Sequence, residues 1–211
     1  MPENNCPLCG STGQLFFSNE KHRFFSCDHC RGIFRTPEQI LNPEQEKHRY
    51  LLHQNHLEDK GYLNFVSPIL EAVRSEYESN AVGLDFGCGH TPVISEVLKN
   101  ENYKVDLYDP VFYPQSSFDG KTYDFVVCCE VMEHFQNPKK EFDLLAELLK
   151  PSGNLICMTS LHSEEIDFES WYYKNDPTHV FLYRKETLAY ITRNWDFSHL
   201  KIEEPLVVFS K

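Results

Sequence analysis

One short stretch, residues 82–89, constrains the fold of this chain more than any other. It reads Val-Gly-Leu-Asp-Phe-Gly-Cys-Gly, an apolar run that predicts a buried strand followed by a tight glycine turn. A helical pattern then begins at Thr91-Pro92. Strand, glycine turn and helix form the arrangement in which backbone atoms approach a nucleotide-like ligand. Gly87 and Gly89 can adopt positive φ without placing a Cβ in the ligand's path. An enzyme with a nucleotide cofactor is therefore the leading hypothesis.

Length and charge narrow the classes of protein that fit. A chain of 211 residues can hold one ordinary α/β domain and a small appendage. Residues 1–50 contain six Lys/Arg and six Asp/Glu, whereas residues 51–211 contain 14 and 26, which accounts for the whole net charge of −12. An acidic main domain repels phosphate backbones, so nucleic acid is disfavoured as a partner. Since the sequence shows neither a membrane span nor a secretory signal, we expect a cytoplasmic protein.

The first four cysteines have the spacing of a metal site. They form two Cys-x2-Cys pairs separated by 17 residues, which is typical of a zinc ribbon. Two short strands are expected between the pairs, over residues 14–18 and 22–26, and Gly10 and Gly32 follow the pairs where tight turns need them. Because four thiolates complete a tetrahedral shell, we predict a structural zinc ion and no catalytic one. The predicted ligands are Cys6, Cys9, Cys27 and Cys30.

The segment after the ribbon is expected to be helical. Residues 42–45, Asn-Pro-Glu-Gln, have the N-cap, the proline and the glutamine of a well-formed helix start, and this helix should run to about Leu57. The Lys-Gly pair at 60–61 is expected to break the pattern, and the Ser-Pro pair at 67–68 to begin a second helix. The predicted organisation is a zinc ribbon over 1–40, a helical linker or lid over 41–80 and the main domain over 81–211.

From residue 81 onward, predicted strands and helices alternate, which indicates a mostly parallel sheet with right-handed crossovers. The expected strands cover 81–86, 103–108, 123–129 and 154–159. The expected helices cover 92–101, 139–150 and 185–193. Two final strands, near 200–202 and 206–209, have no helix between them and predict an antiparallel ending. The predicted fold class is thus α/β, with a Rossmann-like sheet, an antiparallel C-terminal strand and a small N-terminal zinc ribbon.

The glycine turn does not suit every nucleotide cofactor. A dehydrogenase would place a third glycine where this chain has Pro92, which weakens an NAD(P) site. An acidic residue is nevertheless present at the end of the second expected strand, where a carboxylate can accept two hydrogen bonds from ribose hydroxyls. This residue is Asp109, 20 positions beyond Gly89.

Four motifs in order resemble those of class I S-adenosylmethionine (SAM) methyltransferases. They are the turn at 84–89, the strand ending in Asp-Pro at 109–110, Tyr-Asp-Phe-Val-Val-Cys-Cys-Glu-Val-Met-Glu-His at 123–134 and Leu-Lys-Pro-Ser-Gly at 149–153. The resemblance implies that the turn binds the amino acid portion of SAM, the acid after the second strand binds the ribose, and the end of the fourth strand faces cofactor and substrate. The cofactor-binding residues so implied are Asp85, Gly87, Cys88, Gly89, Asp109, Pro110, Glu130, Val131 and Tyr62.

The chain also resembles a narrower bacterial group of unassigned substrate that carries an N-terminal zinc ribbon. The features that carry this resemblance are a His-x-Asn…Gly-Tyr segment over 53–62 and a late Asp-Pro-Thr-His over 176–179. One departure from the family is Thr91, which stands where a third glycine is usual and is interpreted as a helix N-cap. Another is the 13-residue connection between Asp109 and Tyr123, which is too short for the usual helix and strand. It leaves open whether its aromatic residues stack on adenine or pack in the core.

Methyl transfer needs a nucleophile held in line with the sulfonium methyl group and a route for the nucleophile's proton. The candidate catalytic residues are Glu130, Glu133, His134 and His179. Three interpretations stay open: His134 caps a strand–helix junction, one histidine is a general base toward a hydroxyl, or the four residues bind a divalent cation.

We therefore predict a SAM-dependent methyltransferase with a small-molecule acceptor, oxygen being the first choice of nucleophile. An NAD(P)-dependent oxidoreductase is one alternative. The other is a non-catalytic SAM sensor that docks a protein or RNA through its ribbon.

Overall fold

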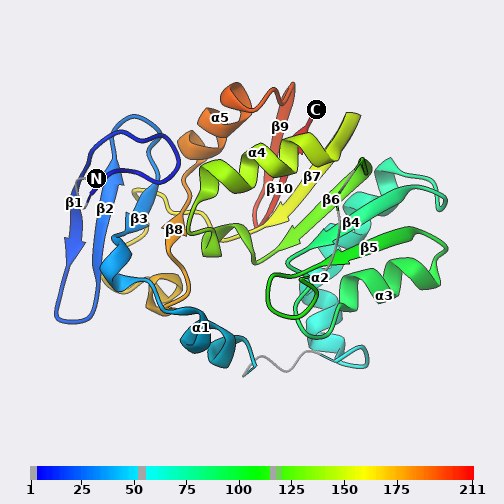
Figure 1. The fold of residues 1–211 in the computed structure, drawn as a ribbon, viewed down its shortest axis with the longest axis horizontal. Coiled ribbons are helices and arrows are strands. Elements are labelled where there is room, and N and C mark those ends of the chain that lie inside the picture. The colour runs from blue at the N-terminus through cyan, green and yellow to red at the C-terminus, as the bar shows by residue number, and fades with distance from the viewer. Residues whose placement is uncertain (1–3, 52–55, 115–117, 119) are drawn as a thin grey trace.

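The computed structural model describes residues 4–51, 56–114, 118 and 120–211, and this part of the chain forms two β-sheets (Figure 1). The larger sheet has the strand order β5-β4-β6-β7-β10-β9 and the smaller one the order β1-β2-β3-β8. The strands of the larger sheet are β4 (Val82–Phe86), β5 (Lys104–Tyr108), β6 (Tyr123–Cys129), β7 (Leu149–Met158), β9 (His199–Glu203) and β10 (Leu206–Ser210). Those of the smaller sheet are β1 (Gly13–Ser18), β2 (Arg23–Cys27), β3 (Ile33–Arg35) and β8 (Phe181–Leu182).

The larger sheet has the predicted architecture. Strands β5, β4, β6 and β7 are parallel, whereas β10 runs antiparallel to both β7 and β9. The helices around the sheets are α1 (Pro43–Tyr50), α2 (Lys60–Glu76), α3 (Val93–Asn100), α4 (Pro138–Leu148) and α5 (Lys185–Asn194). The α/β Rossmann-like fold with antiparallel C-terminal strands and a small N-terminal sheet is thus confirmed. Among the described helices, none has both the length and the apolarity needed to cross a membrane.

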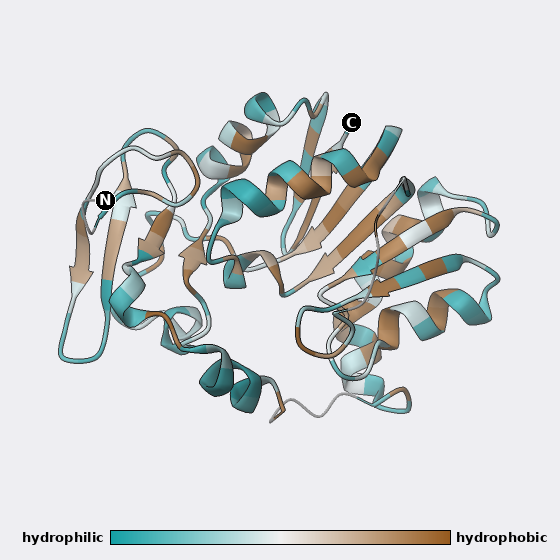
Figure 2. Ribbon diagram, viewed as in Figure 1, coloured by the Kyte–Doolittle hydropathy of each residue, from teal (hydrophilic) through white to brown (hydrophobic). Residues whose placement is uncertain are grey.

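Alternating side chains of the central strands build two cores, one on each face of the sheet. In β6, Val126 and Cys128 pack in a core that also contains apolar residues of α4 and α5. Phe125 and Val127 point the other way, into a core shared with α2 and α3. Because both faces are covered, the central strands are mostly apolar, as their brown colour in Figure 2 shows.

The helical segment before the sheet differs from the prediction. Helix α2 begins at Lys60 rather than at Ser67, because Asp59 Oδ1 accepts hydrogen bonds from the amides of Gly61 (2.8 Å) and Tyr62 (3.2 Å) and so caps the helix. The predicted helix start at residues 42–45 is confirmed, with both hydrogen bonds of the capping box present. That helix, α1, ends at Tyr50, short of the predicted Leu57.

Pro68 lies inside α2, where a proline removes one helical hydrogen bond. The carbonyl of Asn64, four residues earlier, instead accepts a hydrogen bond of 2.9 Å from the Ser67 hydroxyl. This side chain offsets the lost donor, so the helix continues. The predicted family segment over 53–62 falls partly on residues 53–55, which lie outside the described residues.

The smaller sheet joins segments from both ends of the chain. The two strands predicted over 14–18 and 22–26 are present as β1 and β2, which pair antiparallel. Strand β3 then pairs with β8, which places Phe34 opposite Phe181. The second turn of the ribbon differs from the prediction, since Arg31 rather than Gly32 has positive φ (64°). Gly32 is needed for packing instead, because a Cβ there would lie 2.3 Å from the ring of Phe181.

Candidate active site and metal centre

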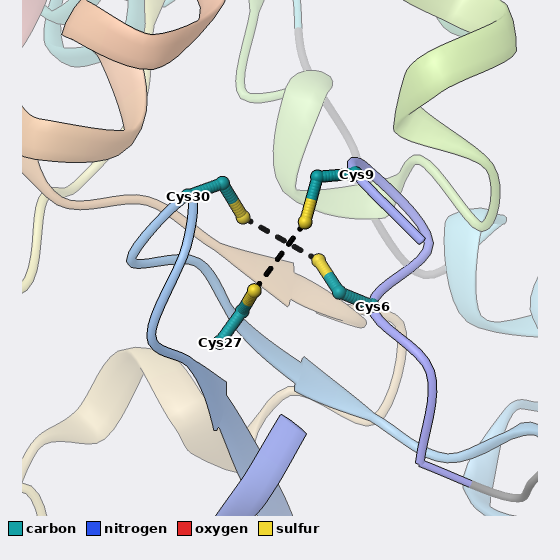
Figure 3. A group of neighbouring side chains, drawn as sticks. All are labelled: Cys6, Cys9, Cys27 and Cys30. Atoms are coloured by element: carbon teal, nitrogen blue, oxygen red, sulfur yellow. Dashed lines mark hydrogen bonds between the residues drawn. The ribbon is translucent and has the colours of Figure 1, made fainter. Parts of the chain in front are cut away.

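The four ribbon cysteines come together as predicted (Figure 3). The sulfur atoms of Cys6 and Cys30 lie 3.4 Å apart, those of Cys9 and Cys27 lie 3.3 Å apart, and all four lie within 4.8 Å of one another. A tetrahedral zinc ion with Zn–S distances of about 2.3 Å holds its sulfurs about 3.8 Å apart. The donor set and its spacing therefore fit a structural zinc ion.

A cavity of about 1080 Å³ opens at the carboxyl ends of β4, β5 and β6. This is the edge at which open α/β sheets bind ligands. Most of the residues singled out in the sequence line it: Tyr62, Gly87, Cys88, Gly89, Asp109, Pro110, Glu130, Val131, His134 and His179. Asp85 and Glu133 lie behind this lining, each fully or nearly fully buried.

The two glycines of the turn have different roles in the structure. Both have positive φ, 82° at Gly87 and 67° at Gly89. A Cβ on Gly87 would lie 2.5 Å from Cγ2 of Val131, whereas a Cβ on Gly89 would meet no atom within 4 Å. Gly87 is therefore required by the packing of the protein itself. Gly89 presents open backbone to the cavity, which is what a closely approaching ligand needs.

Two carboxylates hold the turn in place. Asp109 accepts the amide of Gly89 on Oδ2 (3.1 Å) and the amides of Val111 and Phe112 on Oδ1 (2.8 and 2.9 Å). A carboxylate has about four acceptor positions, so Asp109 retains capacity for one ribose hydroxyl rather than the expected two. Asp85 accepts a hydrogen bond of 2.6 Å from the hydroxyl of Ser95, and its burial raises its pKa to about 6. This bond ties α3 to the end of β4 beneath the turn.

Two glutamates just beyond the end of β6 bond to the hydroxyl group of the same tyrosine. The hydroxyl of Tyr173 bonds to the carboxyl groups of both Glu130 (3.1 Å) and Glu133, and the hydroxyl of Thr159 donates to Glu133 (3.1 Å). Burial raises the pKa of both carboxyl groups, and the charge of Glu133 raises that of Glu130 further. Glu130 has a φ of 52°, which is uncommon for a residue other than glycine.

Two histidines of the cavity each bond through Nδ1 to a backbone carbonyl. Nδ1 of His134 bonds to the carbonyl of Thr178 (3.0 Å) and Nδ1 of His179 to the carbonyl of Tyr173 (2.7 Å). Because a carbonyl only accepts, each Nδ1 carries the proton, and Nε2 of the neutral ring is an acceptor. Burial lowers the pKa of His134, and it lowers that of His179 to about 4. Both rings are therefore neutral at neutral pH.

The same geometry bears on the metal interpretation. Glu133, His134 and His179 can each offer one ligand atom within a group spanning 4.8 Å, whereas Glu130 is not part of that group. Hydrogen bonds from Nδ1 to backbone carbonyls are typical of metal-binding histidines. They also suit an imidazole that accepts a proton on Nε2. The base and metal interpretations thus share one arrangement of side chains.

One wall of the cavity comes from the segment that was predicted as a helical linker or lid. It is formed by α1, a helix with no buried residue that is hydrophilic on all sides (Figure 2). Arg49 donates from Nε (3.2 Å) and Nη2 (2.7 Å) to Oδ2 of Asp176, and the ring of Tyr50 lies edge-on to that of His134 with centroids 5.6 Å apart. A helix without an apolar face indicates a position away from the core, and this was the available signal.

Comparison with known proteins agrees with this geometry. The family described as "Methyltransferase domain" matches residues 52–202, which is more than half of the chain. The protein therefore belongs to this family of methyltransferases. It carries a SAM-dependent methyltransferase domain, and the family assignment favours SAM over NAD(P) as the cofactor.

Individual relatives are distant. A solved SAM-dependent methyltransferase from Archaeoglobus fulgidus superposes with a TM-score of 0.53 at 17% identity, covering 70% of this chain and 94% of that one. Human N-acetylserotonin methyltransferase in complex with SAM gives a TM-score of 0.52 at 13% identity, covering 70% and 52%. A ubiquinone biosynthesis O-methyltransferase from Photobacterium profundum is 28% identical over 81 residues, which are 38% of this chain and 34% of that protein. The chain thus spans about a third of this curated relative.

Proposed function

We propose that this protein transfers the methyl group of SAM to a small-molecule acceptor, with a hydroxyl oxygen as the first choice of nucleophile. The observation that carries the proposal is one cavity that is lined both by Gly89, with its open backbone, and by His134 and His179. The relation to O-methyltransferases supports oxygen as the methylated atom, although each such relative is distant. A cytoplasmic location and a structural zinc ion in the ribbon belong to the same proposal.

In this proposal the cofactor brings a methyl group already activated by its sulfonium, and the protein supplies binding, orientation and a proton acceptor. The Gly87–Gly89 turn receives the amino acid portion, and the remaining acceptor position of Asp109 takes one ribose hydroxyl. Nε2 of His179 or His134 would accept the proton of the acceptor's hydroxyl group while the methyl group passes from the sulfur to the hydroxyl oxygen. The neutral state of both rings makes Nε2 available for this step.

A divalent cation held by Glu133, His134 and His179 is the second candidate for activating the hydroxyl. A carboxylate with two imidazoles suits Mn²⁺ or Zn²⁺ better than Mg²⁺. Turnover that survives a chelator specific for divalent ions, at a concentration that leaves the ribbon metal in place, would exclude this candidate.

The test of the proposal is an incubation of the protein with methyl-labelled SAM and the small-molecule fraction of a bacterial cell extract. Mass spectrometry of the labelled product would identify the acceptor and the methylated atom. The double variant His134→Ala, His179→Ala is expected to bind SAM normally and to lose turnover. Tight SAM binding without labelled product from any fraction would favour the non-catalytic sensor instead.

A further inference from the structure

A buried arginine of the ribbon bonds to the loop that carries His179. Arg35 is the last residue of β3 and is 5% exposed. Its Nε donates to the carbonyl of His179 (3.0 Å), and its Nη2 donates to the carbonyls of Lys174 (2.8 Å) and Asp176 (3.5 Å). One guanidinium therefore binds three backbone carbonyls of a segment that is distant in sequence.

The surroundings of this guanidinium fix its position. It lies over the ring of Phe24, 4.3 Å from the centroid, and Nη1 and Nη2 lie 3.4 and 3.3 Å from Nδ1 of His22. A buried cation is costly unless it is hydrogen-bonded. The loop carbonyls supply those bonds, so the folded ribbon favours the one loop conformation in which they converge on Arg35.

A second arginine, which lies on the loop side, bonds to the ribbon. Arg184, which follows β8, donates from Nη1 to the carbonyl of Arg31 (2.6 Å) and to the hydroxyl of Ser26 (3.0 Å). These two acceptors flank the second cysteine pair of the ribbon. The amide of Arg35 also bonds to the carbonyl of Val180 (2.9 Å). The ribbon and the loop are thus joined on both sides of His179.

We propose that Arg35 is a positioning residue for methyl transfer. It holds the backbone over residues 174–179 so that His179 lines the cavity and the carbonyl of Thr178 orients His134. The ribbon thereby helps to form the part of the cavity that would hold the methyl acceptor, away from its four-cysteine cluster. The inference rests on the proposed role of the two histidines.

The test uses the full-length, metal-loaded protein and the variants Arg35→Met and Arg35→Lys. Lysine keeps the charge, but its single nitrogen cannot reproduce the bonds that Arg35 makes from the separate Nε and Nη2 atoms. The matched control is Arg23→Met, because Arg23 is exposed on the same ribbon and lies over the Phe25 ring at 5.3 Å. Three quantities are measured: the Kd for SAM by calorimetry, amide hydrogen exchange over residues 172–182, and turnover of methyl-labelled SAM with the small-molecule extract. The melting temperature of each variant is recorded as a check on its fold.

Both Arg35 variants are expected to keep the Kd and KM for SAM within about twofold of wild type. Exchange over 172–182 should accelerate by about tenfold or more, because the loop opens locally, and kcat should fall by a similar factor. The control should match wild type in all three measurements. Unchanged exchange in Arg35→Met would overturn the inference, and so would loss of SAM binding together with a lower melting temperature, since that would show a general structural role. Failure of wild type to bind SAM would instead overturn the proposed function, which the exchange measurement does not depend on.

Discussion

The two glycines of the turn allow a paired prediction, because the structure separates a packing requirement from a ligand requirement. Alanine at either position must adopt positive φ, which costs about 1–2 kcal/mol. At Gly87 the new Cβ also lies 2.5 Å from Val131, and overpacking of this kind costs about 1–3 kcal/mol more. At Gly89 the free protein offers no clash, since no atom lies within 4 Å.

Gly87→Ala should therefore lose about 2–5 kcal/mol of folding free energy, and Gly89→Ala only about 1–2 kcal/mol. For a chain of this size each kcal/mol lowers the melting temperature by about 2–4 °C. For cofactor binding we expect the opposite order, with Gly89→Ala the more damaging substitution. Its Cβ projects into the space where SAM would contact the backbone. A loss of about 1.4 kcal/mol of binding free energy raises the Kd for SAM tenfold, and we expect a loss of at least this size.

Thermal unfolding followed by circular dichroism, together with calorimetric titration of SAM, measures both effects on the same samples. We expect Gly87→Ala to be the less stable variant and Gly89→Ala, although it is the more stable of the two, to bind SAM poorly. Normal SAM affinity in Gly89→Ala would refute the placement of the cofactor. Equal melting temperatures for the two variants would refute the packing argument.

Three further predictions concern other parts of the molecule. Cys9→Ser should lower the zinc content measured by atomic emission from one ion per chain to a substoichiometric value and lower the melting temperature; unchanged metal content would contradict the site. Burial raises the pKa of Glu133 above its ordinary 4.5, so the folded state holds this proton more tightly and loses stability as the pH rises past that value. Glu133→Gln stays neutral and should gain stability relative to wild type as the pH rises from 4.5 to about 7 in urea titrations, whereas an unchanged difference between the two proteins over this range would contradict the prediction. Arg49→Met removes a partly exposed ion pair with Asp176 and should cost at most about 1 kcal/mol, with a raised KM for the labelled extract acceptor; a loss of several kcal/mol would contradict the view of α1 as a peripheral wall.

The sequence was most informative where structure is decided locally. Strand β6 was predicted over its full extent, 123–129, because an uninterrupted apolar run from Phe125 to Cys129 fills most of it and an acidic residue follows. The glycine turn was predicted because glycine adopts positive φ at no steric cost. The residues at the strand ends followed from topology, since parallel strands bring their carboxyl ends to one edge.

Contacts between distant segments could not be predicted in this way. Strand β8 has two residues, too few for any periodicity, and it forms only because β3 lies beside it. The roles of Arg35 and Tyr173 depend on hydrogen bonds to residues more than 40 positions away. The helix start at Asp59 was missed for a local reason, because the glycine at 61 was interpreted as a helix breaker although an aspartate cap precedes it.

A crystal structure with bound S-adenosylhomocysteine, the demethylated form of the cofactor, tests the central claim most directly. We expect its amino acid portion to lie against the Gly87–Gly89 backbone, one ribose hydroxyl to bond to Asp109, and its sulfur to face the Nε2 atoms of His134 and His179. Density for the compound elsewhere on the protein, or its sulfur turned away from the two histidines, would contradict the account.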